Sequence, residues 1–408
     1  MKSNVIMDIL IVRDFRHYWT IGFLTSTARW FEIMAFSVLS WELTGDASIA
    51  GWMFAFRMIS LGITGAIFAM LGHLFSGVMV MVATQLLVGV SCLVPIFISF
   101  AFIEYDVLPV LYVISIFSGI LWSVDFSYRR RLLGDTLPSK IVGSGVSLDV
   151  LSSHATRLLG MVFGGLTLSM GDENLIFLFL AVIYILSTFL YFGKKDAVPF
   201  KQGVTGVSKL FKKVIKHAFK NIPVLTVLAL TPIFNVFVLP FFTLISLLFL
   251  EKFRTGELEA GAFSSLEAIG ALAGGVLISI FYPKKEVVTF CTMLFTLLIS
   301  VLFTSLCEIK YLIVIFIFFT GFSSSCYSAL QSSIIYTFTE PNLRSATLSV
   351  LTVSIGTGFL GAVNVAWLGA NLSIDQILMV MSIEGIAFGL IFLILVWARA
   401  QYLKKAIL

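Results

Sequence analysis

The segment GILWSVDFSYRRRLLGDTLPSKIVGSGVSLDVLSSHATRLLGMVFGG, residues 119–165, contains the pattern on which the rest of the chain is built. It joins the end of one apolar run, 108–133, to another, 144–169, through a short turn at Pro138. Three consecutive arginines, residues 129–131, lie near the end of the first run. Since about 20 mostly apolar residues cross a bilayer as a helix, the segment predicts two membrane helices joined by a basic turn.

The same pattern continues on both sides of this segment and predicts twelve spanning helices. Arg13 and Arg16 precede the first run without a small-residue cleavage site, so we expect a retained helix and not a signal peptide. The runs lie near 18–41, 50–72, 78–102, 108–133, 144–169, 174–192, 222–249, 259–282, 287–306, 311–338, 345–370 and 375–398.

The composition agrees with a membrane protein. Hydrophobic residues make up 59% of the chain and charged residues 12%, with a mean hydropathy of +1.03. Soluble domains carry about 25% charged residues, so an ordinary soluble enzyme or nucleic-acid-binding protein is excluded. The four cysteines form no CxxC pair and lie in or beside apolar runs. We interpret them as small core residues and expect no metal site.

The distribution of basic residues predicts the orientation. Of the 27 lysines and arginines, 21 lie in segments that are cytoplasmic if the N-terminus is cytoplasmic. This bias predicts cytoplasmic termini and a multi-pass protein of the cell inner (plasma) membrane. The outer loops hold Lys252, Arg254 and Lys310, and the spans hold Arg29, Arg57 and Arg157.

A weak internal repeat indicates two related halves. Gly119 and Gly321 are 202 residues apart, and Pro138 and Pro341 are 203 apart, close to half of 408. The repeat reflects either a duplication or chance among glycine-rich helices. We expect an all-α membrane protein with twelve transmembrane helices in two pseudo-symmetric six-helix bundles. The predicted domains are 1–192, a cytoplasmic linker at 193–221, and 222–408.

The linker ends in SKLFKKVIKHAFKN, residues 208–221, which predicts a basic amphipathic helix. Leu210, Phe211, Val214 and Ile215 share one stripe, while lysines fill the opposite face. Such a helix suits the surface of an anionic inner leaflet, and a regulatory partner is the alternative. Glycine sets in the spans, among them Gly160, Gly270 and Gly361, predict close helix packing.

Residues 119–165 also resemble helix 4, the cytoplasmic turn and helix 5 of the major facilitator superfamily, and in particular its branch of enterobactin exporters and macrolide efflux proteins. The resemblance implies the fold of that family, alternating access and export. It rests on an aromatic residue followed by an arginine pair and two leucines, then an Asp and a Pro, and then an Arg-Leu-Leu-Gly stretch. The matching residues here are Phe126, Arg130, Arg131, Leu132, Leu133, Asp135, Pro138, Arg157, Leu158, Leu159 and Gly160.

The chain departs from the family pattern in two places. The loop between helices 2 and 3, within AMLGHLFSGVMV, lacks the usual acid and basic residues and has only His73 as a titratable group. In helix 1, Ala28-Arg29-Trp30 stands where relatives often have Gly-Asp-Trp. We therefore do not assign to this chain the charged interactions that this loop makes in the family, nor a proton-coupling acid at position 29.

Charged residues deep in a membrane are costly, so each should face a cavity or a partner. The family arrangement implies a central cavity lined by four of these charged residues and one asparagine. The excess of positive charge in that cavity would suit an anionic substrate. The alternative is that Arg29–Glu32, three residues apart, and Arg157–Asp149 are internal pairs that set helix packing. The candidate substrate-binding residues are Arg29, Glu32, Arg57, Arg157 and Asn235.

Three groups are candidate proton carriers, namely Glu32, Glu267 and His154. For Glu267 and His154 a structural hydrogen bond or ion pair is the alternative. At the inner end of the fourth span we expect either a gate-side ion-pair cluster or simple topology determinants, formed by Asp125, Arg129, Arg130 and Arg131.

We therefore expect a monomeric secondary transporter of a small molecule, possible cargoes being a siderophore or a drug, with the proton as coupling ion. No cofactor and no nucleic-acid partner are expected, and membrane lipids surround the chain. The alternatives are an importer or lipid flippase of the same fold and a non-transporting sensor. An enzyme is not expected, because the sequence has no HExxH, GxSxG or histidine cluster.

Overall fold

The computed structural model describes residues 5–71, 76–101, 106–138, 141–191, 207–340 and 343–407. Within these ranges the chain forms helices and no strand, which confirms the predicted all-helical membrane class. Eight helices in this part are long and apolar enough to cross a membrane. Two shorter apolar helices, Leu108–Val124 and Glu173–Phe189, accompany them.

The first group of helices covers the N-terminal part of the chain. They are α1 (Val5–Ile11), α2 (Arg13–Thr44), α3 (Ala47–Leu71), α4 (Gly77–Phe100), α5 (Leu108–Val124), the π-helical turn η2 (Asp125–Arg129), α6 (Arg130–Asp135), α7 (Val142–Leu168) and α8 (Glu173–Phe189).

The second group begins with the amphipathic linker helix. They are α9 (Val207–Ala218), α10 (Ile222–Phe237), α11 (Phe241–Phe253), α12 (Glu257–Ile280), α13 (Glu286–Leu306), α14 (Lys310–Phe338), α15 (Arg344–Gly356), α16 (Gly358–Gly369) and α17 (Ile374–Ile407).

All twelve predicted runs coincide with helices where the structure describes them. The run 108–133 passes through the π turn η2 between α5 and α6, and two other runs are interrupted. The run 222–249 breaks between Phe237 and Phe241, where Pro240 caps the start of α11 and has no backbone N–H to continue α10. The run 345–370 breaks at Thr357, between Gly356 and Gly358, where glycine favours helix least among residues other than proline. Each break leaves two helical pieces along one predicted run.

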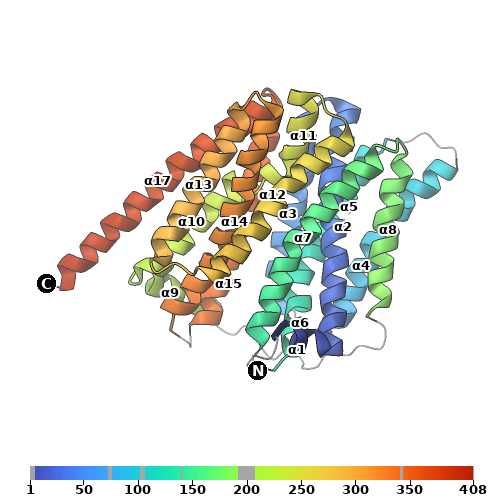
Figure 1. The fold of residues 1–408 in the computed structure, drawn as a ribbon. Coiled ribbons are helices and arrows are strands. Elements are labelled where there is room, and N and C mark those ends of the chain that lie inside the picture. The colour runs from blue at the N-terminus through green and yellow to red at the C-terminus, as the bar shows by residue number, and fades with distance from the viewer. Residues whose placement is uncertain are drawn as a thin grey trace. The chain divides into compact units, whose positions relative to one another are not determined.

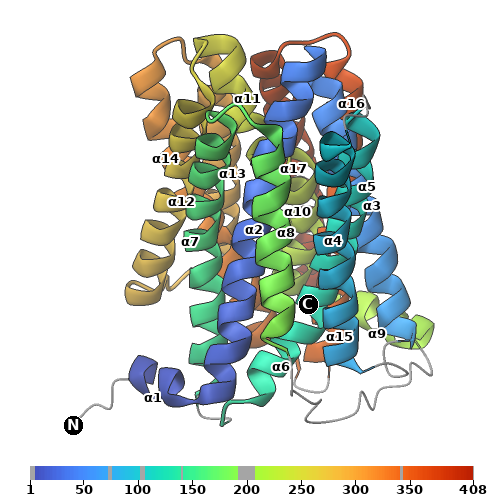
Figure 2. The same ribbon diagram turned by 90° about the vertical axis from the view of Figure 1, so that its right-hand side faces the viewer.

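The chain forms two compact units. The first comprises Met1–Gly45, Phe56–Val204 and Thr255–Ser265, and the second comprises Asp46–Ala55, Thr205–Arg254 and Leu266–Leu408. In the first unit α2 packs against α7 and α8, and α4 packs against α8 and α5 (Figure 2). In the second unit α13 packs against α14 and α17, and α10 packs against α17 (Figure 1). The helices α3 and α12 each contribute residues to both units.

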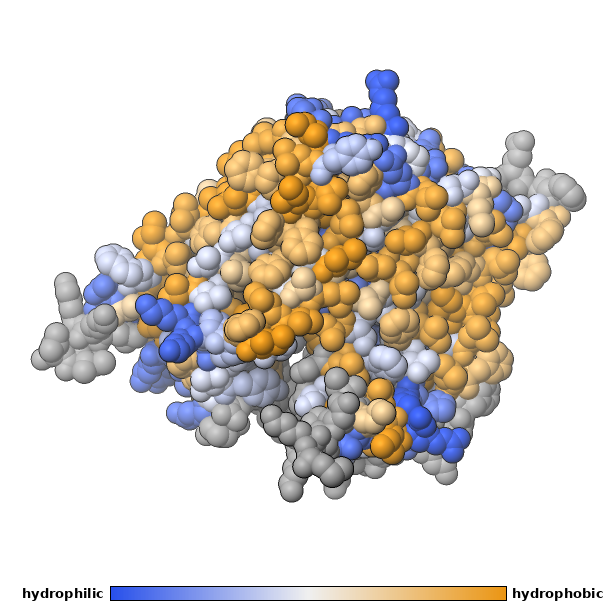
Figure 3. Space-filling view, in the orientation of Figure 1, coloured by the Kyte–Doolittle hydropathy of each residue, from blue (hydrophilic) through white to orange (hydrophobic). Residues whose placement is uncertain are grey.

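The surface follows the hydropathy of the spans. In the view of Figure 3, hydrophobic residues cover the middle of the helices, while hydrophilic residues gather mainly towards their ends. Exposed apolar side chains of this kind include Phe97 at 70% and Ile394 at 62%. An apolar band bounded by polar ends is the surface that a bilayer covers.

Candidate functional site

A carboxylate surrounded by four helices lies at the centre of the candidate site. Glu32 on α2 has no exposed surface. Arg57 of α3 donates from Nη2 to Oε1 of Glu32, and Ser118 of α5 donates from Oγ to Oε2 at 2.6 Å. The hydroxyl of Tyr184 on α8 lies 3.4 Å from the same Oε2. The first unit therefore encloses one acid with a cation and two hydroxyl donors.

Arg57 has hydrogen-bonding capacity that this carboxylate does not use. The residue is 2% exposed, and its Nε and Nη1 atoms have no hydrogen-bond partner among the described residues. Its backbone is held close to α5 by Gly119, where a Cβ atom would lie 3.0 Å from the carbonyl carbon of Arg57. A buried guanidinium with two such donors is suited to bind a further acceptor.

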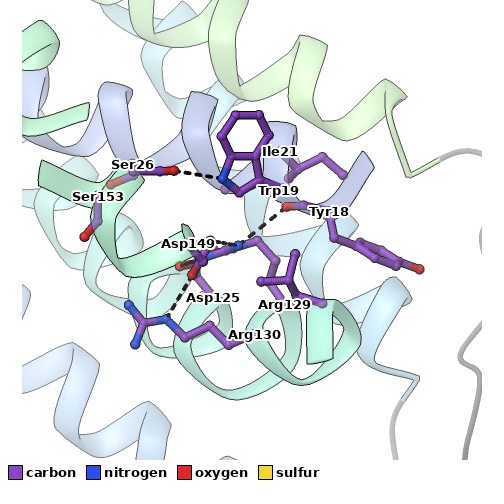
Figure 4. A network of polar contacts seen from close by, with 12 residues as sticks. Tyr18, Trp19, Ile21, Ser26, Asp125, Arg129, Arg130, Asp149 and Ser153 are labelled. Carbon is purple, nitrogen blue, oxygen red and sulfur yellow. Dashed lines mark hydrogen bonds and ion pairs between the residues drawn. The ribbon is translucent and has the colours of Figure 1, made fainter. Parts of the chain in front are cut away.

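A second cluster lies where α5 passes through η2 into α6 (Figure 4). Arg129 donates from Nε to Oδ1 of Asp125 at 2.5 Å, and from Nη1 and Nη2 to the two carboxylate oxygens of Asp149 at 2.8 and 3.2 Å. Arg130 adds an ion pair to Asp149 at 3.7 Å. A bidentate arginine–carboxylate pair is strong and directional, so Arg129 fixes η2 to α7.

The same guanidinium also reaches α2. Nη1 of Arg129 lies 3.5 Å from the carbonyl oxygen of Tyr18, and the side chain rests against Gly22, where a Cβ atom would lie 2.8 Å from Nε. The wide π turn contributes to this geometry, because its i→i+5 hydrogen bond from Arg130 to Asp125 shifts the register of the helix. Arg129 therefore ties three helical segments of the first unit together.

Arg29 connects the two clusters. It lies one turn before Glu32 on α2, with Nη2 3.4 Å from Oδ2 of Asp125 and its guanidinium 4.8 Å from the centre of the Trp122 ring. The predicted internal pair Arg29–Glu32 is wrong, since Arg29 binds Asp125 and Glu32 binds Arg57. Both charges therefore find a partner of opposite charge on another helical segment.

Arg157 lies apart from Asp149, and the predicted pair between them is wrong as well. Eight residues along a helix correspond to about 12 Å, which is beyond ion-pair distance. Asp149 instead binds Arg129 and Arg130. Arg157 hydrogen-bonds Nδ1 of His154 at 3.0 Å and lies 5.1 Å from the ring of Trp30 on α2.

The remaining candidates lie in the second unit. Asn235 on α10 is 4% exposed and donates from Nδ2 to the carbonyl oxygen of Thr231 at 2.9 Å. Gln331 of α14 donates to the hydroxyl of Thr231 at 2.7 Å. Glu267 on α12 is fully buried beside Gly321 of α14. A cavity shared by Asn235 and the residues of the first unit stays a prediction.

Some expectations fall outside the described residues. The side chain of Arg131 is one, and His73 in the loop between the second and third spans, at 72–75, is another. Two residues of the site were missed by the sequence analysis, Ser118 and Tyr184. Serine and tyrosine are frequent in apolar helices, so their types alone carried no signal.

A third acidic group lies beyond the opposite end of the first predicted span. Burial of the Glu42 carboxyl is the largest cause that raises its pKa, to about 7. The charge and hydrogen bond of Glu257 and the charge of Glu173 raise it further.

Within the described residues no group of three or more His, Cys, Asp or Glu is placed to hold a metal ion.

Comparison with known proteins places this geometry in context. Residues 18–309 match the family model described as the Major Facilitator Superfamily. No curated protein sequence matches the chain.

Solved structures match it over almost its whole length. A D-xylose–proton symporter has a TM-score of 0.68 at 13% identity, covering 92% of this chain and 97% of its own. A peptide transporter in complex with sulfate has a TM-score of 0.72 at 12% identity, covering 95% of both chains. A bacterial homolog of the human lysosomal transporter Spinster, inward-facing and unoccupied, has a TM-score of 0.66 at 12% identity, covering 96% and 97%. At these identities the likeness concerns the fold.

Proposed function

Because the chain belongs to the Major Facilitator Superfamily, we propose that it is a secondary transporter that couples the export of a small organic anion to proton movement. The family and its transporter neighbours favour a carrier over an enzyme. The proposal includes alternating access, a monomer in the cell inner (plasma) membrane with cytoplasmic termini, and no cofactor.

The single observation that carries the proton part is the buried pair of Glu32 and Arg57. While Arg57 is in place, the charge of the carboxylate is compensated. If Arg57 turns towards a substrate, Glu32 is left as a buried unpaired charge, and binding a proton is less costly than keeping that charge. Substrate and proton can thus compete through one arginine.

The balance of charge supports an anionic substrate. Among the described side chains of the two clusters, the cations Arg29, Arg57, Arg129 and Arg130 outnumber the acids Glu32, Asp125 and Asp149 by one positive charge. Arginine binds carboxylates through two parallel hydrogen bonds, and Arg57 has two donors available. A carboxylate-rich metabolite or siderophore fits this chemistry, and the resemblance to siderophore and drug exporters favours the outward direction.

The test uses proteoliposomes that contain a pH-sensitive dye and the full chain. Candidate compounds are the metabolites that accumulate in cells lacking the gene, under iron limitation and in plain medium. We expect that adding one of these compounds to proteoliposomes with the wild-type protein causes protons to cross the membrane, which the dye reports as a change of pH. Glu32→Gln should abolish this proton movement and retain substrate binding, because glutamine keeps the shape of the side chain but cannot exchange a proton.

Glu340→Gln, which neutralises an exposed carboxylate after α14, is the matched control and should behave as the wild type. Full pH-driven flux by Glu32→Gln would remove Glu32 from the coupling step. Substrate accumulation inside the cell on expression would indicate import, lipid translocation would indicate a flippase, and binding without any flux would indicate a sensor.

A further inference from the structure

The helix α9 carries a strongly asymmetric charge distribution. Val214 and Ala218 are buried, while Lys212, Lys213 and Lys216 are exposed on the other side. Lys220, just after the helix, is exposed too, and residues 207–220 contain no acid. The charged residues on the exposed side, as far as their side chains are described, are therefore all basic.

This helix is fastened at its C-terminal end. Nε of Arg399 on α17 donates to the carbonyl oxygen of Phe219 at 3.0 Å. Asn221 caps α10 through Val224 N–H at 3.3 Å, and its Nδ2 donates to the carbonyl oxygen of Phe338 at 2.5 Å. The lysine face is thus held in a fixed position by α10, α14 and α17 of the second unit.

The contacts of Arg399 also indicate the level of α9 relative to a bilayer. Its guanidinium lies 5.9 Å from the ring of Phe219 and 5.1 Å from the ring of Tyr402. Trp397 and Tyr402, in the C-terminal part of α17, are both 63% exposed. Exposed tryptophan and tyrosine with arginine at a helix end are typical of the membrane–water interface. Figure 1 shows α9 at the same end of this unit as the C-terminus of α17.

We propose that the lysine face of α9 binds the phosphate headgroups of anionic phospholipids, and so anchors the second unit to the surface of the inner leaflet. Charge complementarity and the interfacial position support this occupant. The binding surface is separate from Glu32 and Arg57, so the inference does not depend on the proposed transport reaction.

The test measures how the purified full chain in neutral detergent binds fluorescent phosphatidylglycerol and fluorescent phosphatidylcholine, by energy transfer from its tryptophans. We expect tighter binding of phosphatidylglycerol, weakened by salt. Lys212→Gln with Lys216→Gln should reduce that preference about 25-fold, since each interfacial lysine is worth roughly a factor of five.

The matched control is Lys284→Gln with Lys285→Gln, which removes two exposed lysines between α12 and α13. It should keep the preference, and Lys212→Arg with Lys216→Arg should keep it as well. Equal binding of the two lipids by the wild type, or unchanged preference in the α9 glutamine variant, would overturn the proposal. An equal loss in the control variant, or displacement by free inorganic phosphate, would overturn it too, since binding would then follow total charge or a small anion.

Discussion

Replacing Gly22 by alanine tests whether Arg129 holds the three helical segments together. An alanine Cβ at this position would lie 2.8 Å from Nε of Arg129 and still closer to the rest of the guanidinium. The three atoms nearest to this Cβ position all belong to the Arg129 guanidinium, so the guanidinium must shift. The bonds at risk are the two to Asp149, at 2.8 and 3.2 Å, and the contact with the carbonyl oxygen of Tyr18.

The magnitude follows from those bonds. A hydrogen bond to a charged group contributes about 1.5–3 kcal/mol, so losing both bonds to Asp149 costs roughly 3–6 kcal/mol. Alanine in place of glycine favours the helix by about 0.5–1 kcal/mol. We therefore expect Gly22→Ala to lower the free energy of unfolding by about 2–5 kcal/mol, measured by denaturant titration in mixed micelles.

Gly62→Ala in α3 is the matched control, because nothing lies within 4 Å of its Cβ position and the site is exposed. It should be as stable as the wild type or slightly more stable. The double-mutant cycle with Arg129→Gln isolates the cause, since Gly22→Ala should cost little once the guanidinium is absent. Equal stability of the two alanine variants, or an undiminished cost in the Arg129→Gln background, would refute the reasoning.

Two further predictions concern helix packing and pH. Because burial and Glu257 raise the pKa of Glu42 to about 7, from an ordinary value near 4.3, its stabilising contribution should be complete below that ordinary value and lost as the pH rises through about 7. Thermal unfolding between about pH 4 and 9 should show this loss in the wild type but not in Glu42→Gln, and parallel curves for both would contradict it. Gly361→Ala should destabilise the second unit by about 1–3 kcal/mol, since its Cβ would lie 2.7 Å from the carbonyl carbon of Val236 on α10. Gly356→Ala, with nothing within 4 Å, is the control, and equal thermal midpoints would show that α16 and α10 can separate without cost.

The spans were predictable from the sequence because lipid imposes a simple rule of length and apolarity. That rule works poorly for α2 and α7, which are missing from the eight helices apolar enough to span. Their charged residues lower the mean hydropathy, and these same residues build the candidate site. These two helices supply Arg29, Glu32 and Asp149 to the candidate site, while α3, α5, α8 and η2 supply their partners.

The partners of the buried charges were not predictable. The high cost of a charge in a membrane singles out Arg29 and Glu32 from the sequence alone. Which helix supplies each partner depends on how the helices are rotated and shifted relative to one another. That arrangement cannot be read from the residues that surround each charge in a single sequence. Arg57 was recognised as a charge within a span but not as the partner of Glu32, and Asp125 was assigned to the inner end without its link to Arg29.

The π turn at 125–129 also has an implication for comparing relatives by sequence. Such a turn holds one residue more than a regular helix needs, so removing one would turn it into an ordinary α turn and change the direction in which Arg129 points. A relative with a single-residue deletion here would keep its fourth apolar span at nearly full length, yet aim its arginine away from α7. An alignment gap of one position within 125–129 would thus separate homologues that share this linkage from those that do not.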